Sequence, residues 1–237
     1  MIISHKHKFI FIKPQKTAGT SVELMLSRIC GDKDVITPLG FDPDPNVREK
    51  HNATPPQNYY RKKPFKHWKI SEMYHHFFKN KKTNSNYWEH LNADLIRQYV
   101  GDDIWHSYKK VSIVRNPWDH AVSWFKWQEI RGIGGTTKGE FKKYLINNYR
   151  STWPYYTIKH GFYDIDFMIK FENIDQDIEE LLKLLDIKEK LILPKTKNKI
   201  REKKDYRDFY TSIKMRDIVY EKALPVVDKF KYNFDSI

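Results

Sequence analysis

The sequence contains a single cysteine, Cys30, among its 237 residues. One cysteine cannot close an internal disulfide, which excludes the disulfide frameworks of small secreted domains. Long hydrophobic runs are also missing. The first apolar run, Phe9–Ile12, is too short for the core of a signal peptide, and no stretch approaches the roughly 20 apolar residues that span a bilayer. These absences predict a cytoplasmic protein without a membrane span.

Two common enzyme signatures are absent as well. The Walker A pattern G-x-x-x-x-G-K-[ST], in which the lysine follows the second glycine, does not occur. No Cys, His or carboxylate cluster has the spacing of a metal site, and the adjacent His75 and His76 are expected to point apart. We therefore expect no metal, and the missing Walker lysine weighs against an ATP-dependent kinase.

Positive charge is in excess, because 43 Lys and Arg stand against 30 Asp and Glu, for a formal net charge of +13. Such a balance favours an anionic partner such as a nucleotide, an acidic polymer, a membrane surface or nucleic acid. The lysines are scattered, densest at 195–204, and no nucleic-acid-binding module is evident. A solvated surface explains the charge equally well, and a non-enzymatic nucleic-acid-binding protein stays an alternative.

Short apolar strands alternate with helical patterns along the chain. Strands are expected at Phe9–Ile12, Val111–Val114 and Phe167–Phe171. Helices are expected over residues 22–29 and 92–100. Three more are expected: one that begins at Pro117, one that ends at Tyr149 and one that begins at Asp175. A last helix is expected from Thr211 to Phe230, with a bend or break at Pro225. The alternation predicts an α/β protein with a P-loop-like three-layer fold, in which helices flank a central parallel sheet.

No internal repeat divides the chain, which predicts a single domain over residues 1–237. Residues 38–90 differ from the remainder, because six prolines interrupt any long element and aromatic and histidine residues are dense. This stretch is expected to be an irregular insertion that forms a lid or a wall beside the site.

The segment Pro14–Ser21 lies between the first expected strand and the first expected helix. The N–H groups of a first helical turn have no partner within the helix, and the helix dipole favours negative charge there. Gly19 allows close approach of the backbone, and Lys16 adds a positive charge. Hydroxyl donors come from Thr17, Thr20 and Ser21. The segment predicts an anion site, with a plain turn capped by Thr or Ser as the alternative.

A second strand–turn–helix segment spans residues 111–123. Arg115 ends the strand, where α/β sheets bind ligands, and Asn116-Pro117 suits the start of a helix. Asn116 and Ser123 are seven residues apart, so they lie nearly on one helix face. Arg115 and Ser123 are therefore predicted to clasp one phosphate, with the guanidinium donating in a plane. The alternative places Arg115 in a structural ion pair and Ser123 in packing.

Together these segments resemble the sulfotransferases that use 3′-phosphoadenosine 5′-phosphosulfate (PAPS), especially their carbohydrate branch. Lys16-Thr17-Ala18-Gly19-Thr20-Ser21 is similar to the 5′-phosphosulfate loop, with Gln15 as a departure before the lysine. Residues 115–123 are similar to the 3′-phosphate motif, with His120 where the family often has arginine. Weaker similarity continues at residues 171–173, 206–210 and 230–232, and it is weakest over 38–88.

The resemblance implies transfer of a sulfuryl group from PAPS to an acceptor hydroxyl, with a glycan as the leading acceptor and the 38–90 insertion on the acceptor side. A small alcohol, a phenol or a tyrosine peptide remains open. The PAPS-binding residues it implies are Lys16, Thr17, Ala18, Gly19, Thr20, Ser21, Arg115 and Ser123.

The same resemblance implies two catalytic residues. Lys16 would stabilise the bridging oxygen of the leaving phosphate, and His90 would be the base, since related enzymes place a catalytic histidine between the two motifs. Alternative bases are His51, His67, His76, Glu72 and Glu89. Competing functions are an ATP-dependent P-loop-like kinase, a nucleic-acid-binding protein and a catalytically inactive scaffold of the same fold.

Overall fold

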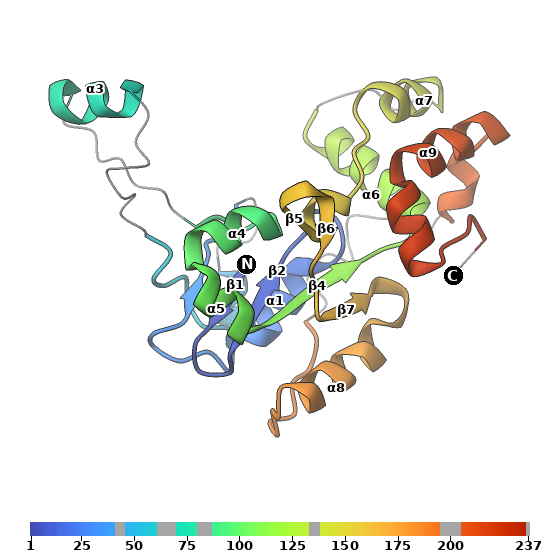
Figure 1. The fold of residues 1–237 in the computed structure, drawn as a ribbon. Helices are drawn as coiled ribbons and strands as arrows, with labels where there is room; N and C mark the ends of the chain where they lie inside the picture. The colour runs from blue at the N-terminus through green and yellow to red at the C-terminus, as the bar shows by residue number, and fades with distance from the viewer. Residues whose placement is uncertain (41–45, 61–69, 80–86, 133–137, 195–204, 236–237) are drawn as a thin grey trace.

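A computed structural model describes residues 1–40, 46–60, 70–79, 87–132, 138–194 and 205–235. A five-stranded sheet with the order β3-β1-β2-β4-β7 lies at its centre (Figure 1). Its strands are β1 (Ile2–Ser4), β2 (Phe9–Ile12), β3 (Val35–Ile36), β4 (Lys109–Val114) and β7 (Phe167–Lys170). A separate two-stranded ribbon joins β5 (Thr157–Ile158) and β6 (Phe162–Tyr163).

The sheet is mixed, which corrects the expectation of a parallel sheet. β2, β4 and β7 are parallel to one another, but β1 pairs antiparallel with both β2 and β3. Only a few residues join β1 to β2, and so short a connection can form a hairpin but not the crossover that parallel pairing requires. The Asp34 carboxylate holds this turn, since it accepts the N–H groups of His5 (2.7 Å) and Lys6 (3.1 Å).

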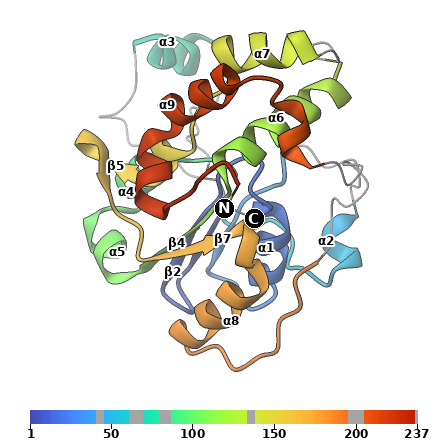
Figure 2. The same ribbon diagram turned by 90° about the vertical axis from the view of Figure 1, so that its right-hand side faces the viewer.

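Helices cover both faces of the sheet (Figures 1 and 2). Alternate residues of β2 face opposite sides, as the twofold repeat of a strand requires. Phe9 and Phe11 pack in a cluster with α1 and α8, whereas Ile10 and Ile12 pack in the larger cluster that contains side chains of α4, α6, α7 and α9. The helices are α1 (Gly19–Ser27), α2 (Val47–Lys50), α3 (Ile70–Lys79), α4 (Ala93–Val100), α5 (Asp102–Ser107), α6 (Pro117–Ile130), α7 (Lys138–Asn147), α8 (Ile174–Leu184) and α9 (Ile213–Phe230).

The helix ends predicted from the sequence are confirmed at two places. Asn92 caps α4 by accepting the N–H of Leu95, and Gly101 ends that helix with a φ of 83°. Asn116 caps α6, with Pro117 in its first turn. Pro225, in contrast, lies within α9 and does not split it. The continuous helix packs against α6 and α7.

The expected insertion, residues 38–90, contains more regular structure than its prolines indicate. It contains α2 and α3, and Gln57 pairs with Ile36 at the edge of the sheet. Val47 and Ala53 pack against Leu24 of α1, so the start of the insertion is joined to the core. None of the helices in the described ranges combines the length and apolar character that crossing a bilayer requires.

Candidate functional site

The loop after β2 leaves the first turn of α1 open. Lys16 and Ala18 have left-handed backbone conformations, with φ of 61° and 65°, an arrangement common at ligand-binding loops. The Thr17 hydroxyl, which is buried, donates to the carbonyl of Pro14 (3.1 Å) and stabilises the turn. Ala18 is the N-cap and offers no side-chain acceptor to the helix. The first-turn N–H groups of α1 therefore lack a side-chain cap and suit an anion.

The loop after β4 meets this first loop. Because β2 and β4 are parallel neighbours, their carboxyl ends lie at the same edge of the sheet. The Arg115 guanidinium donates to the carbonyl of Lys16 (3.2 Å) and to Asp119 Oδ2 (2.6 Å), and it lies 4.1 Å from the ring centroid of Phe171. The structure thus brings Arg115 and the Lys16 segment together.

Asp119, not Ser123, is the side chain that holds Arg115. Asp119 lies four residues after the arginine, and two guanidinium nitrogens are each 2.6 Å from its Oδ2. Ser123 is half-buried one turn further along α6. The joint phosphate contact of Arg115 and Ser123 stays a prediction. Arg115 precedes α6, so the rule that pairs opposite charges four residues apart within a helix did not predict this ion pair.

The Lys16 ammonium lies near the aromatic surface of α6. Its Nζ is 5.4 Å from the ring centroid of Trp127, within the range of a cation–π contact. Trp127 in turn packs edge-on against Trp124, with 5.0 Å between the ring centroids. These contacts connect the first loop to the middle of α6.

His90 contacts the first residue of the same loop. Its Nδ1 lies 2.9 Å from the carbonyl oxygen of Lys13, and because a carbonyl only accepts, Nδ1 carries the proton. Burial lowers the pKa of His90 to about 4; the charge of Glu89 opposes this shift, and that of Lys13 adds to it. At neutral pH the ring is therefore uncharged, with a lone pair on Nε2 that can accept a proton.

A buried charge network lies behind His90, and the sequence analysis did not predict it. The Lys13 ammonium lies 2.9 Å from Glu23 Oε2 and 2.5 Å from Glu89 Oε2, and Arg48 pairs with Glu23 Oε1 at 2.6 Å. Burial alone would raise the pKa of Glu23, but nearby positive charges, Lys13 foremost, lower it to about 2. Spacing does not reveal such a network, because its members come from the loop after β2, from α1 and α2, and from the segment before α4.

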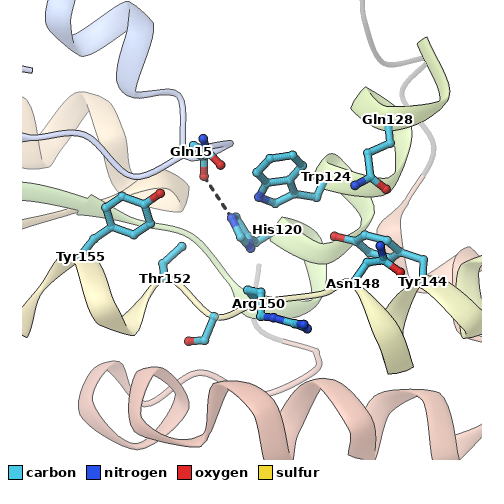
Figure 3. Close-up of a pocket in the computed structure, with 10 residues that line it drawn as sticks. Gln15, His120, Trp124, Gln128, Tyr144, Asn148, Arg150, Thr152 and Tyr155 are labelled. Carbon is cyan, nitrogen blue, oxygen red and sulfur yellow. Dashed lines mark hydrogen bonds between the residues drawn. The ribbon is translucent and has the colours of Figure 1, made fainter. Parts of the chain in front are cut away.

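A pocket of about 360 Å³ opens beside the first loop. Figure 3 shows Gln15, His120 and Trp124 close together. His120 is buried, and its Nε2 lies 3.0 Å from the Gln15 carbonyl, which fixes the proton on Nε2; burial lowers the pKa of this histidine to about 4. The lining residues combine aromatic rings, amides and one guanidinium: Gln15, His120, Trp124, Gln128, Tyr144, Asn148, Arg150, Ser151, Thr152 and Tyr155.

Several sequence candidates are not placed by these observations. His67 lies outside the described residues, as does the basic tract 195–204, and the side chains of Glu72, His75 and His76 are not described. In the described part of the chain, no three His, Cys, Asp or Glu side chains form a group that could hold a metal ion. The expectation that no metal is needed stays a prediction.

Fold and loops together define an α/β protein with a candidate anion site at the carboxyl ends of β2 and β4. A family model described as the Sulfotransferase family matches residues 1–227. The chain therefore belongs to the sulfotransferase family, and its general reaction is sulfuryl transfer. Comparisons with curated proteins and with solved structures gave no match.

Proposed function

We propose that this sulfotransferase moves a sulfuryl group from PAPS to a hydroxyl group of a carbohydrate. The observation that carries the proposal is the contact between the two loops, in which Arg115 donates to the Lys16 carbonyl. That contact places a guanidinium, an ammonium and the uncapped start of α1 at one edge of the sheet. PAPS carries phosphate at its 3′ and 5′ positions, and two cationic loops side by side fit such a donor.

The residues present fit the two ends of the donor. The 5′-phosphosulfate would bind at residues 16–21, where backbone N–H groups and the Thr20 and Ser21 hydroxyls are donors. The 3′-phosphate would bind at Arg115, with Ser123 as a second donor from α6. PAPS supplies a sulfuryl group that is already activated by its bond to phosphate.

Three residues would then perform distinct tasks. His90 accepts the proton of the acceptor hydroxyl on Nε2 as the new bond from that oxygen to sulfur forms. Lys16 stabilises the negative charge on the phosphate oxygen as its bond to sulfur breaks. Asp119 holds Arg115, and thereby orients the 3′ end of the donor. Position and electrostatics supply the catalysis, as in phosphoryl transfer.

Replacing Arg115 with alanine tests the donor site. We expect isothermal calorimetry with the product nucleotide 3′-phosphoadenosine 5′-phosphate (PAP), without added metal, to show binding that Arg115→Ala weakens by about 10- to 100-fold, because a hydrogen bond between charged groups is lost. Arg28→Ala removes an exposed arginine and is the matched control. Circular dichroism checks that both variants fold. Preference for magnesium-ATP over PAP would contradict the proposal and favour the kinase.

The pocket beside Gln15 supports a carbohydrate acceptor. Aromatic side chains stack on sugar rings, and amides hydrogen-bond to hydroxyl groups. Trp124 and Tyr155 supply rings, and Gln128 and Asn148 supply amides. Trp124 packs edge-on against Trp127, and the Lys16 ammonium lies over the ring of Trp127, which connects the pocket wall to Lys16.

Trp124→Ala tests this acceptor pocket. With p-nitrophenyl β-D-glucoside as acceptor, we expect kcat/KM to fall by about tenfold, because a stacking surface is lost. Ile130→Ala is the control, since Ile130 lies on α6 but is exposed and outside the pocket. If p-nitrophenol is sulfated with a higher kcat/KM than the glucoside, and Trp124→Ala has no effect on the reaction, a phenol would replace the glycan as the proposed acceptor.

A further inference from the structure

Lys13 is an unusual residue, because its side chain is almost completely buried. Lysine is almost never fully buried unless it is paired. Lys13 is 1% exposed, and its ammonium is paired with Glu23 and Glu89. The mechanism above uses neither Lys13 nor Glu89, so this pairing needs another explanation.

Lys13 is connected to His90 directly through its carbonyl oxygen and indirectly through Glu89. Its carbonyl oxygen accepts the Nδ1–H of the imidazole (2.9 Å), which fixes the tautomer. Its ammonium holds Glu89 Oε2, and the other carboxylate oxygen, Oε1, lies 3.4 Å from His90 Nε2. Glu89 Oε1 also accepts the N–H of Gly40 at 2.6 Å, so both oxygens of this carboxylate are held.

Two glycines make this arrangement possible. A Cβ on Gly40 would collide with Glu89 Oε1, and a Cβ on Gly19 would lie 2.6 Å from Lys13 Cγ. Real Cβ atoms essentially never approach so closely. The Gly19 contact also connects the network to the start of α1, where the donor is proposed to bind. Lys13 is therefore closely packed against Gly19 at the start of α1, and Glu89 against Gly40, which follows β3.

We propose that Lys13 and Glu89 are positioning residues for sulfuryl transfer, with Glu89 as the counter-charge of the imidazolium that forms when His90 accepts the acceptor proton. This inference rests on the proposed function. In the resting state Nε2 has a lone pair and gains nothing from the carboxylate. Once Nε2 has taken the proton, Nε2–H can donate to Glu89 Oε1. Glu89 therefore favours the protonated product of the proton transfer.

The charges around His90 predict opposite effects for the two residues. Glu89 Oε1 lies 3.4 Å from His90 Nε2, and the Lys13 ammonium pairs with the other oxygen of Glu89. Glu23 from α1 pairs with the Lys13 ammonium, and Arg48 from α2 and the amino group of Met1 pair in turn with Glu23. Glu89→Gln removes a negative charge and should lower the pKa of His90. Lys13→Met keeps most of the side-chain volume but removes a positive charge, and should raise that pKa.

The test combines three measurements on the full chain: the pKa of His90 by NMR of histidine-labelled protein, PAP binding by calorimetry, and turnover of p-nitrophenyl β-D-glucoside. We expect Glu89→Gln to reduce kcat by about tenfold or more and to change the PAP Kd by less than about twofold. The His90 resonance is assigned with His90→Gln. The pKa is expected to move down in Glu89→Gln and up in Lys13→Met.

Lys110→Met is the matched control for loss of a buried ion pair. Lys110 is similarly buried and pairs with Asp166 at 2.8 Å, but it lies at the opposite end of β4 from Arg115. We expect this control to lower stability without moving the His90 pKa. If Lys13→Met does not fold, the Glu89→Gln variant alone tests the positioning role. We expect Glu89→Asp, which keeps the carboxylate, to retain part of the activity that Glu89→Gln loses.

Failure of the positioning role and failure of the proposed function give different results. An unchanged kcat in Glu89→Gln, or a His90 pKa that rises in this variant, would overturn the positioning role. Absence of PAP binding by the unaltered protein would instead refute the proposed donor, while the NMR titration would still test the electrostatic role of Lys13 and Glu89.

Discussion

Lys16→Met is expected to lower the rate of sulfuryl transfer by about 10²- to 10³-fold, the effect of removing one donor that stabilises developing charge. Lys16 is a cationic residue of the loop between β2 and α1, and its carbonyl contacts Arg115. Charge builds on the leaving phosphate oxygen in the transition state, where an ammonium interacts more strongly than it does in the ground state. Methionine keeps an unbranched side chain but has no charge.

The measurement is kcat with saturating PAPS and p-nitrophenyl β-D-glucoside, together with the Kd for PAP. We expect kcat to fall much more than PAP affinity, because most of the lost interaction belongs to the transition state. Lys33→Met is the control, since Lys33 is exposed beyond the end of α1. Equal losses of PAP affinity and kcat/KM at unchanged kcat would assign Lys16 to donor binding alone.

His90→Gln is expected to lower kcat by about 10²- to 10⁴-fold, the usual contribution of a general base. Glutamine can keep a hydrogen bond to the Lys13 carbonyl but cannot take up the acceptor proton. His106→Gln is the control, because His106 is an exposed histidine of α5. Activity within about twofold of the unaltered protein in His90→Gln would transfer the role of base to another group.

The pH dependence of this reaction follows from the same histidine. A base must be unprotonated, so activity is lost as the pH falls through its pKa. Because burial lowers the pKa of His90 to about 4, we expect kcat/KM to stay constant from pH 8 to about 5 and to fall only below that. A fall near pH 6.5, the ordinary pKa of histidine, would contradict the buried environment of His90.

The strands and helices that carry the two motifs could be predicted from the sequence. β2, β4 and β7 are short apolar runs, and the Asn92 and Asn116 caps mark helix starts through contacts within a few residues. The two strands at one side of the sheet, β1 and β3, were missed, because they are only three and two residues long and show no period. The antiparallel pairing of β1 therefore came only from the structure.

The residues of the candidate site could likewise be predicted only in part from the sequence. Lys16 and Arg115 could be recognised because each belongs to a contiguous strand–loop–helix segment with characteristic residues. The importance of Asp119 was missed, although its spacing from Arg115 was visible. His120 could not be recognised as part of a pocket wall, since its neighbours Gln15, Tyr144 and Tyr155 lie far away in the sequence.

The sequence by itself determined the family, the order of the motifs and the identity of the cations, because these depend on local residue patterns. Only the tertiary structure decided which residues surround them. The parallel pairing of β2 with β4 brings Arg115 to the Lys16 carbonyl across 99 residues, and folding brings Glu89 to Lys13 across 76. Burial then sets the protonation of His90, since the cost of charging a group depends on the solvent and charges around it, which no local pattern encodes.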